Sequence, residues 1–245
     1  LGKATLAVNF MLLLAIPLAG WAAYFASRVL IPSKAIRFWG AATYALLPAM
    51  TGSLAQGRLG TSFAAFILPF ALRSGVRMLT PDSTRRRAAG TALLFALLLA
   101  FAPALWLISL VCAVLALAFI RRTKEAVIKA AITFGASFAA LVPWSFSLVL
   151  NPVQFFFEPG LNSATLTDPD ISMVDIFLLH PGGPGMSPIV ITIGIVLAAV
   201  LALVRTDRRS VAVLLITAAW VGILFALVQV VFLFTPAGAT TQMRT

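Results

Sequence analysis

The chain has 245 residues, of which 61% are hydrophobic and 10% are charged. Soluble domains contain roughly 45–50% apolar and about 25% charged residues, and a chain of this length has too little interior to hide so large an apolar excess from water. A soluble fold is therefore excluded. We expect a membrane protein whose excess apolar side chains face lipid.

The net charge of +11 and the single cysteine narrow the class further. Basic residues in so apolar a chain fit the topology rule for membrane loops better than nucleic-acid binding, so we expect no nucleic-acid partner. Cys112 lies in an apolar run, and one cysteine makes neither a disulfide framework nor a metal site. Because the chain begins with Leu1 and stops at Thr245 on an open polar stretch, we expect an internal piece of a longer polypeptide.

Apolar stretches of roughly 17–25 residues, the length that crosses a bilayer, predict six membrane spans. They cover 5–27, 35–50, 62–78, 125–149, 188–204 and 210–234. We interpret the first as a span rather than as a signal peptide, because a hydrophobic chain follows it. No segment alternates apolar with polar residues as a membrane barrel requires, so an all-α bundle over 1–245 is expected.

The stretch 88–120 is too long for one span. As a single helix its 33 residues would extend about 50 Å, whereas the hydrocarbon core is about 30 Å thick. Pro103 lies near its middle and disfavours helix at Ala102, which predicts a tight hairpin of two short helices. The predicted fold is therefore a polytopic transmembrane helical bundle of about eight spans.

The hairpin also sorts the basic residues between the two sides of the membrane. Only Lys3, Arg58 and Arg244 fall on one side, and fifteen fall on the other, whereas a single long span would give nine and nine. By the positive-inside rule, the side with fifteen is cytoplasmic. We therefore predict a multi-pass protein of the cell membrane, with both chain ends and the loops 51–61 and 151–187 on the outer face.

The loop 51–61 carries the first candidate site, for an anionic substrate. Arg58 is the only arginine in an outward loop between spans, and its forked guanidinium suits the oxygens of a phosphate or diphosphate. Gly57 and Gly60 allow close approach of the backbone to a ligand. Gln56, neighbouring hydroxyls and backbone N–H groups complete the predicted substrate-binding set. The alternative is a turn arginine that snorkels to lipid headgroups.

The loop 151–187 carries the second candidate site and four of the seven acidic residues. Glu158 and Asp168 are the candidate catalytic carboxylates. The alternatives are a lid that packs on the bundle and, for Asp168, a helix cap. His180 is the sole histidine and cannot form a metal site alone, so we assign no metal and no other cofactor.

Three short motifs carry a family resemblance. They are a Tyr-x-Leu-x-Pro pattern over 44–48, Gly-Arg-Leu-Gly over 57–60 and Leu-Pro-Phe over 68–70. In these motifs the chain resembles the membrane part of actinobacterial polytopic glycosyltransferases. These include proteins that fuse a family-two glycosyltransferase domain to a multi-span region and, more distantly, arabinofuranosyltransferase-like proteins of the GT-C class. The likeness extends across the whole chain in hydropathy.

This resemblance implies a transferase that moves a sugar from a polyprenyl-phosphate donor in the membrane lipid to a cell-envelope glycan acceptor on the outer face. Arg58 would hold the carrier phosphate as charge develops on it. The acidic base of such enzymes belongs to an outward loop that would precede Leu1, so no residue here matches it. The alternatives are a transporter or flippase of lipid-linked intermediates, and a non-catalytic membrane scaffold for a cytoplasmic glycosyltransferase domain.

Overall fold

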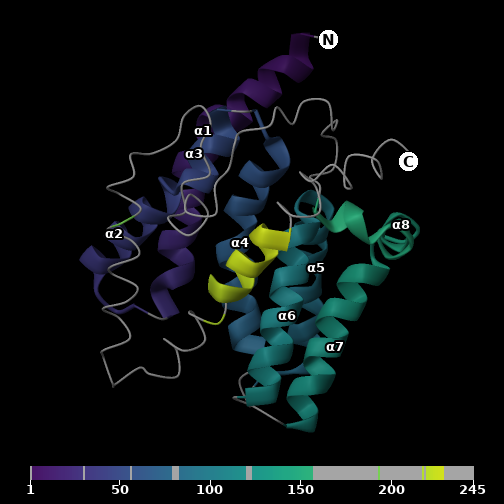
Figure 1. Cartoon of the computed structure of the whole chain (residues 1–245). Helices are drawn as coiled ribbons and strands as arrows, with labels where there is room; N and C mark the ends of the chain where they lie inside the picture. The colour runs from purple at the N-terminus through teal and green to yellow at the C-terminus, as the bar shows by residue number, and fades with distance from the viewer. Residues whose placement is uncertain are drawn as a thin grey trace.

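The computed structural model describes residues 2–29, 31–55, 57–78, 83–119, 123–156, 193, 217 and 219–228. Within these residues all regular structure is helical, as predicted (Figure 1). The elements are α1 (Gly2–Ala26), η1 (Ser27–Val29), α2 (Lys34–Ala45), α3 (Pro48–Ala55), α4 (Leu59–Met78), α5 (Arg85–Phe101), α6 (Pro103–Phe119), α7 (Lys124–Ala139), α8 (Trp144–Leu150) and η2 (Pro152–Phe156), followed by a helix over Ala219–Val228.

Two described helical stretches, Val8–Val29 and Leu59–Met78, are long and apolar enough to cross a membrane. A third candidate is the pair α7 and α8, which passes the same test only when taken together. Large apolar side chains on α1 are exposed, among them Leu6, Phe10 and Leu13, as expected of a helix that faces lipid. The described residues are thus consistent with membrane association and contain two or three candidate spans.

Two predicted spans are wrong as continuous helices. In the span 35–50, α2 ends at Ala45 and α3 begins at Pro48, because proline disfavours helix in the residue before it. At 12 residues α2 is about 18 Å long, shorter than the hydrocarbon core. The span 125–149 is bent by 103° between α7 and α8, at a turn that contains Pro143.

The last two predicted spans fall largely outside the described residues. Of the span 210–234, the structure describes the helix Ala219–Val228 and residue 217. Of the span 188–204, it describes residue 193. The count of eight spans therefore stays a prediction.

The predicted hairpin at Pro103 is present. Helix α5 ends at Phe101, Ala102 has a non-helical backbone (φ −147°, ψ 79°), and α6 starts at Pro103. Leu117, near the end of α6, packs in one cluster with Ala88, near the start of α5, so the two helices run antiparallel. An ion pair of 2.8 Å between Arg85 and Glu125 then joins the start of α5 to the start of α7.

The helices that flank α4 bring the basic residues to one end of the bundle. Arg73 on α4 donates from Nη1 to the carbonyl oxygen of Phe25 at 3.1 Å, which joins the ends of α1 and α4. Met78, at the last residue of α4, packs with Ala88 of α5 and Ala130 of α7. We call this end the basic end; its described members are Arg28, Lys34, Arg37, Arg73, Arg77, Arg85, Arg86, Arg87, Lys124 and Lys129.

Small residues dominate the contacts between helices. Alanine makes up more than half of the buried apolar residues, and on α1 the buried face consists of Ala15, Ala19, Ala22 and Ala26. A Cβ placed on Gly20 of α1 would lie 3.3 Å from the Cβ of Ala45 on α2. Such close backbone approach is typical of helices packed in membranes, where small residues line the contact.

Larger side chains fill the core between α4 and α7. Leu98 and Leu99 are fully buried there, with Phe95, Trp106 and Phe134 around them. The indole Nε1 of Trp106 donates to Ser137 Oγ at 2.9 Å, which ties α6 to α7.

Candidate functional site

Arg58 lies in the tight turn between α3 and α4. The predicted loop 51–61 is wrong for most of its length, because α3 continues to Ala55 and α4 begins at Leu59. The 20 residues of α4 extend about 30 Å, so this turn lies about one bilayer thickness from the basic end. Arg58 is the only basic residue at this end whose side chain the structure describes.

Gly57 ends helix α3. Its backbone is left-handed (φ +67°), a conformation that favours glycine. The N–H of Gly57 donates to Leu54 O at 3.0 Å, and the N–H of Arg58 donates to Ser53 O at 2.8 Å. These two bonds form a Schellman motif, which satisfies carbonyl groups at the helix end. Helix termination therefore explains Gly57 without any ligand.

Arg58 also begins helix α4. Its carbonyl oxygen accepts hydrogen bonds from the N–H of Ser62 at 3.2 Å and from Ser62 Oγ at 2.8 Å. Both backbone polar groups of Arg58 are thus used locally. Its half-buried guanidinium forms no hydrogen bond or ion pair with any described residue. No described residue occupies its fork of five N–H donors, which suits a ligand that accepts hydrogen bonds.

The first turn of α4, which directly follows Arg58 in the chain, adds further hydrogen-bond donors. The backbone N–H groups of Leu59 and Gly60 come before the first helical hydrogen bond and have no acceptor among the described residues. They carry the partial positive charge of a helix N-terminus, and the first turn contains no acidic residue. The site therefore contains donors and positive charge, which suits an anion but supplies no base for proton transfer.

The hydroxyl groups predicted to assist Arg58 donate to their own helices. Thr51 Oγ1 donates to Leu47 O at 3.4 Å, and Ser53 Oγ donates to Met50 O at 2.9 Å. Serine and threonine commonly bond to the preceding helical turn in this way. These bonds were not predicted, because residues 51–55 were expected to form a loop rather than a helix. Gln56, the remaining predicted ligand, lies outside the described residues.

A residue that sequence reasoning overlooked holds the turn in place. Tyr44 Oη donates to the carbonyl oxygen of Ala65 at 2.7 Å, so the end of α2 is tied to the first half of α4. Met50 on α3 packs between Ala15 and Ala19 of α1 in a small buried cluster. The signal for this anchor was present in the Tyr-x-Leu-x-Pro pattern, whose tyrosine makes the contact.

The structure brings no described carboxylate to Arg58. The two candidate catalytic residues, Glu158 and Asp168, lie outside the described residues. The one acidic residue within them, Glu125, is at the basic end, where its hydrogen bond and negative charge raise the pKa of the exposed Arg85. Among the described residues no group of three His, Cys, Asp or Glu side chains could hold a metal ion.

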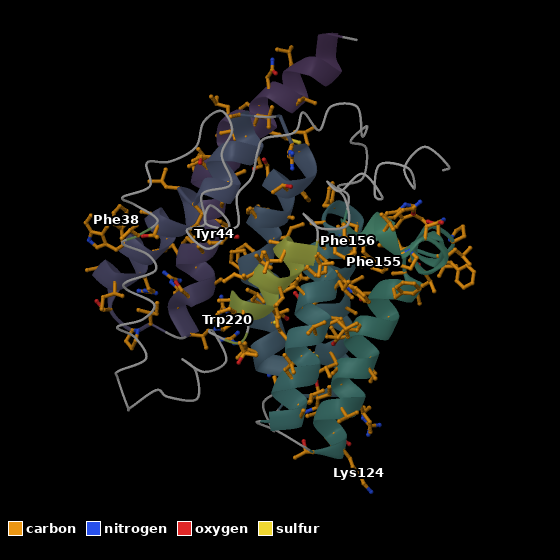
Figure 2. The ribbon with its side chains drawn as sticks, viewed as in Figure 1. Phe38, Tyr44, Lys124, Phe155, Phe156 and Trp220 are labelled. Carbon is orange, nitrogen blue, oxygen red and sulfur yellow. The ribbon has the colours of Figure 1, made fainter. Side chains whose placement is uncertain are left out.

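The start of the loop 151–187 packs on the bundle. The ring of Phe155 is stacked on Trp106 at 6.3 Å between centroids, and Phe156 is stacked on Phe225 of the helix Ala219–Val228 at 4.6 Å. Phe155 and Phe156 lie beside this helix in the view of Figure 2, far from Lys124 at the foot of α7. For this short part of the loop, packing against the bundle is the role the structure shows.

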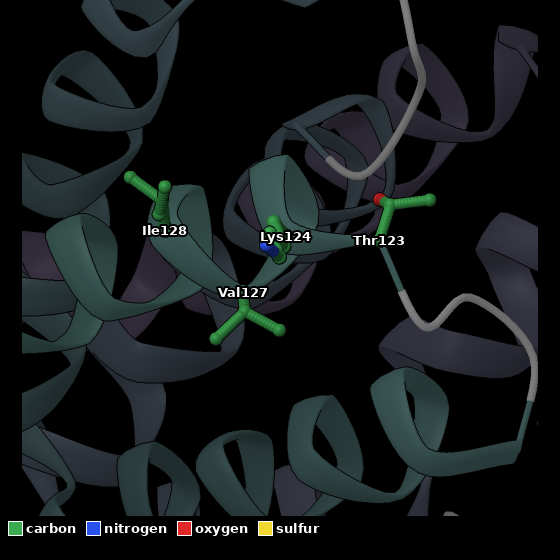
Figure 3. A pocket seen from close by; sticks show the side chains of 4 residues that line it. All are labelled: Thr123, Lys124, Val127 and Ile128. Carbon is green, nitrogen blue, oxygen red and sulfur yellow. The ribbon is translucent and has the colours of Figure 1, made fainter.

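A shallow pocket of about 400 Å³ lies at the start of α7, lined by Thr123, Lys124, Val127 and Ile128 (Figure 3). Thr123 Oγ1 is already engaged there, because it accepts the N–H of Ala126 at 3.3 Å as the helix cap. The remaining walls are apolar apart from the ammonium of Lys124. This pocket is at the basic end, opposite Arg58, so it does not form part of the candidate site.

Comparisons with protein-family models, with curated proteins and with solved structures find no match for this chain. The described features that bear on function are the helical, membrane-compatible fold and the hydrogen-bond donors of Arg58, Leu59 and Gly60.

Proposed function

We propose that this chain is part of an integral membrane glycosyltransferase that uses a polyprenyl-phosphate-linked sugar donor and a cell-envelope glycan acceptor. The observation that supports this function is the turn at Arg58. There, Arg58, whose guanidinium has no partner among the described residues, directly precedes Leu59 and Gly60, whose N–H groups open α4 about 30 Å from the basic end. An anionic group held at one membrane surface fits this arrangement, and a lipid-borne phosphate is such a group.

In this proposal Arg58 binds the phosphate of the donor and stabilises it as it becomes the leaving group. When the bond between the sugar and the phosphate oxygen breaks, negative charge increases on that phosphate, and fixed donors lower the energy of the transition state. The acceptor hydroxyl must lose its proton to a base. Glu158 and Asp168 are the candidates within this chain, and a carboxylate elsewhere in a longer polypeptide is the alternative.

The test is a sugar-transfer assay on the full-length protein reconstituted in lipid. Replacing one donor that stabilises developing charge typically lowers the rate about 10²-fold to 10³-fold, which is the loss expected for Arg58→Ala. Arg58→Lys should retain part of the activity, since it keeps the charge but not the fork. Arg86→Ala at the basic end is the matched control and should leave transfer unchanged.

Unchanged transfer together with unchanged affinity for the donor in Arg58→Ala would remove Arg58 from the site and overturn the proposal. Donor affinity is measured separately with a short-chain polyprenyl phosphate, whose binding should weaken in Arg58→Ala and not in Arg86→Ala. A third outcome is that the parent protein transfers no sugar but Arg58→Ala still weakens binding of the polyprenyl phosphate. The protein would then bind lipid phosphate without catalysing transfer.

A transporter or flippase of lipid-linked intermediates is the second candidate, and the bend of 103° between α7 and α8 favours it. Broken helices line the substrate sites of many carriers. The two functions differ in what happens without an acceptor. A flippase moves a fluorescent lipid-linked sugar across a vesicle membrane under those conditions, whereas a transferase leaves its distribution unchanged. If neither activity is found, the scaffold alternative is favoured.

A further inference from the structure

Three arginines from three separate elements converge on one pair of aromatic residues at the basic end. The Cζ atom of Arg28, in η1, lies 4.5 Å from the ring centroid of Phe25. The Cζ atom of Arg37, on α2, lies 5.0 Å from the ring centroid of Tyr24. Arg73, on α4, reaches the carbonyl oxygen of Phe25 at 3.1 Å. We call Arg28, Arg37 and Arg73 the arginine cluster.

The arginine cluster has no negative partner among the residues that the structure describes. None of its three side chains forms an ion pair with a described residue, and Glu125, the one acidic residue described, is bound to Arg85. The aromatic rings offer Arg28 and Arg37 only their negative faces, an attraction of about 0.5–1 kcal/mol at exposed sites, and Arg73 has only the carbonyl oxygen of Phe25. The like charges of Arg28 and Arg73 repel each other. No anion in the described part of the chain offsets this repulsion.

Arg37 shows most clearly that a partner is missing. Its side chain is only 8% exposed, and its Nε atom is buried without a hydrogen-bond partner. A buried charge is normally paired, because an unpaired one loses its hydration without compensation. The preference for basic residues on the cytoplasmic side explains the sign of these charges. It does not explain why one of them is buried with an unused donor.

Exposed aromatic and aliphatic side chains surround the arginine cluster. On α2, Ile36, Phe38 and Trp39 are each at least 60% exposed, and Trp21 on α1 is 53% exposed. Figure 2 shows Phe38 projecting from the outer side of α2, away from the other helices. Tryptophan and other aromatic residues concentrate where headgroups meet hydrocarbon. The cluster thus lies beside a surface suited to lipid.

We propose that Arg28, Arg37 and Arg73 form a phosphate-binding site at the basic end, distinct from the turn at Arg58, and that an anionic membrane phospholipid supplies the phosphate. Guanidinium groups bind phosphate oxygens through paired N–H donors, and three of them surround a phosphate group with charge-assisted hydrogen bonds. The buried Nε of Arg37 and the second Nη of Arg73 are the donors this anion would engage. The acyl chains would lie against the exposed side chains of α2.

The test measures anionic lipid bound to the full-length protein in nanodiscs of phosphatidylcholine that contain a minor fraction of phosphatidic acid. Bound lipid is counted by native mass spectrometry after release. Arg28→Gln is the first variant, because Arg28 is exposed and its loss should leave the fold intact. We expect affinity for phosphatidic acid to fall about tenfold, the effect of losing a hydrogen bond to a charged group. Arg37→Gln should have at least as large an effect.

Arg86→Gln is the matched control, since it removes the same charge from an exposed position at the same end. It should leave the binding of phosphatidic acid unchanged. Equal losses in Arg28→Gln and Arg86→Gln would show general electrostatic attraction and overturn the proposal. If Arg37→Gln does not fold, Arg28→Gln alone decides between these outcomes.

A second arm separates lipid from free phosphate. Inorganic phosphate is titrated onto the protein in neutral detergent, and thermal stability is compared with that in phosphatidic acid. Stabilisation by the lipid alone supports the proposal as stated. Equal stabilisation by inorganic phosphate, lost in Arg28→Gln, would retain the site but overturn the lipid as its source. No stabilisation by either ligand would overturn the site itself.

Discussion

Trp106→Ala tests whether α6 and α7 pack tightly around the side chain of Trp106. Trp106 is 5% exposed, contacts the ring of Phe134 at 5.7 Å and donates to Ser137 at 2.9 Å. In a bilayer the transfer part of the usual loss vanishes, because lipid is as apolar as the core. A residual cavity of about 100 Å³ costs about 2.4 kcal/mol at about 24 cal/mol per Å³. The lost hydrogen bond adds about 0.6 kcal/mol.

The expected loss is therefore about 3 kcal/mol in the free energy of unfolding. It is measured by reversible unfolding in mixed micelles, followed by circular dichroism. Trp39→Ala is the matched control, because Trp39 is 71% exposed and no ring contact is found for it among the described residues. Its loss should stay within about 0.5 kcal/mol. Equal losses at the two positions would show that Trp106 is not enclosed between α6 and α7.

Gly57→Ala should destabilise the protein by about 1–2 kcal/mol in the same assay, because the new side chain must adopt a left-handed backbone (φ +67°). Gly20→Val should cost about 1–3 kcal/mol by overpacking the contact between α1 and α2, whereas Gly40→Val, with open space around it, should not. In a cysteine-free background, Arg58→Cys and Glu125→Cys should react with a membrane-impermeant thiol reagent from opposite sides; labelling from one side would contradict the 30 Å separation along α4.

The helical class and the hairpin at Pro103 could be predicted from the sequence. Long apolar stretches predict membrane helices, and a proline disfavours helix in the residue before it, whatever the rest of the fold. The same effect of proline explains the break before Pro48. This break was not predicted, because hydropathy is averaged over a window that includes residues on both sides of it. The bend between α7 and α8 was missed for the same reason. Span length alone, without attention to each proline, overestimates the continuity of helices.

The candidate site was predicted in part. The isolation of Arg58 from the other described basic residues followed from counting charges between spans. The termination of α3 by Gly57 and the anchoring role of Tyr44 were missed, because both depend on hydrogen bonds between backbone groups that composition does not reveal. The convergence of the arginine cluster was missed as well, since its members are up to 45 residues apart and meet only when α1, α2 and α4 assemble.

The alanine face of α1 has a consequence for how this protein tolerates substitution. The buried side chains of α1 are already small, so the substitutions that destabilise the protein there are those that introduce a larger side chain. On the outer face, bulky residues can be exchanged for one another as long as they stay apolar. A saturation library should therefore show the strictest positions to be those with the smallest side chains. This ordering is the reverse of that in a water-soluble domain, where trimming the largest interior residues does the harm, and it would map the helix contacts without any further structural measurement.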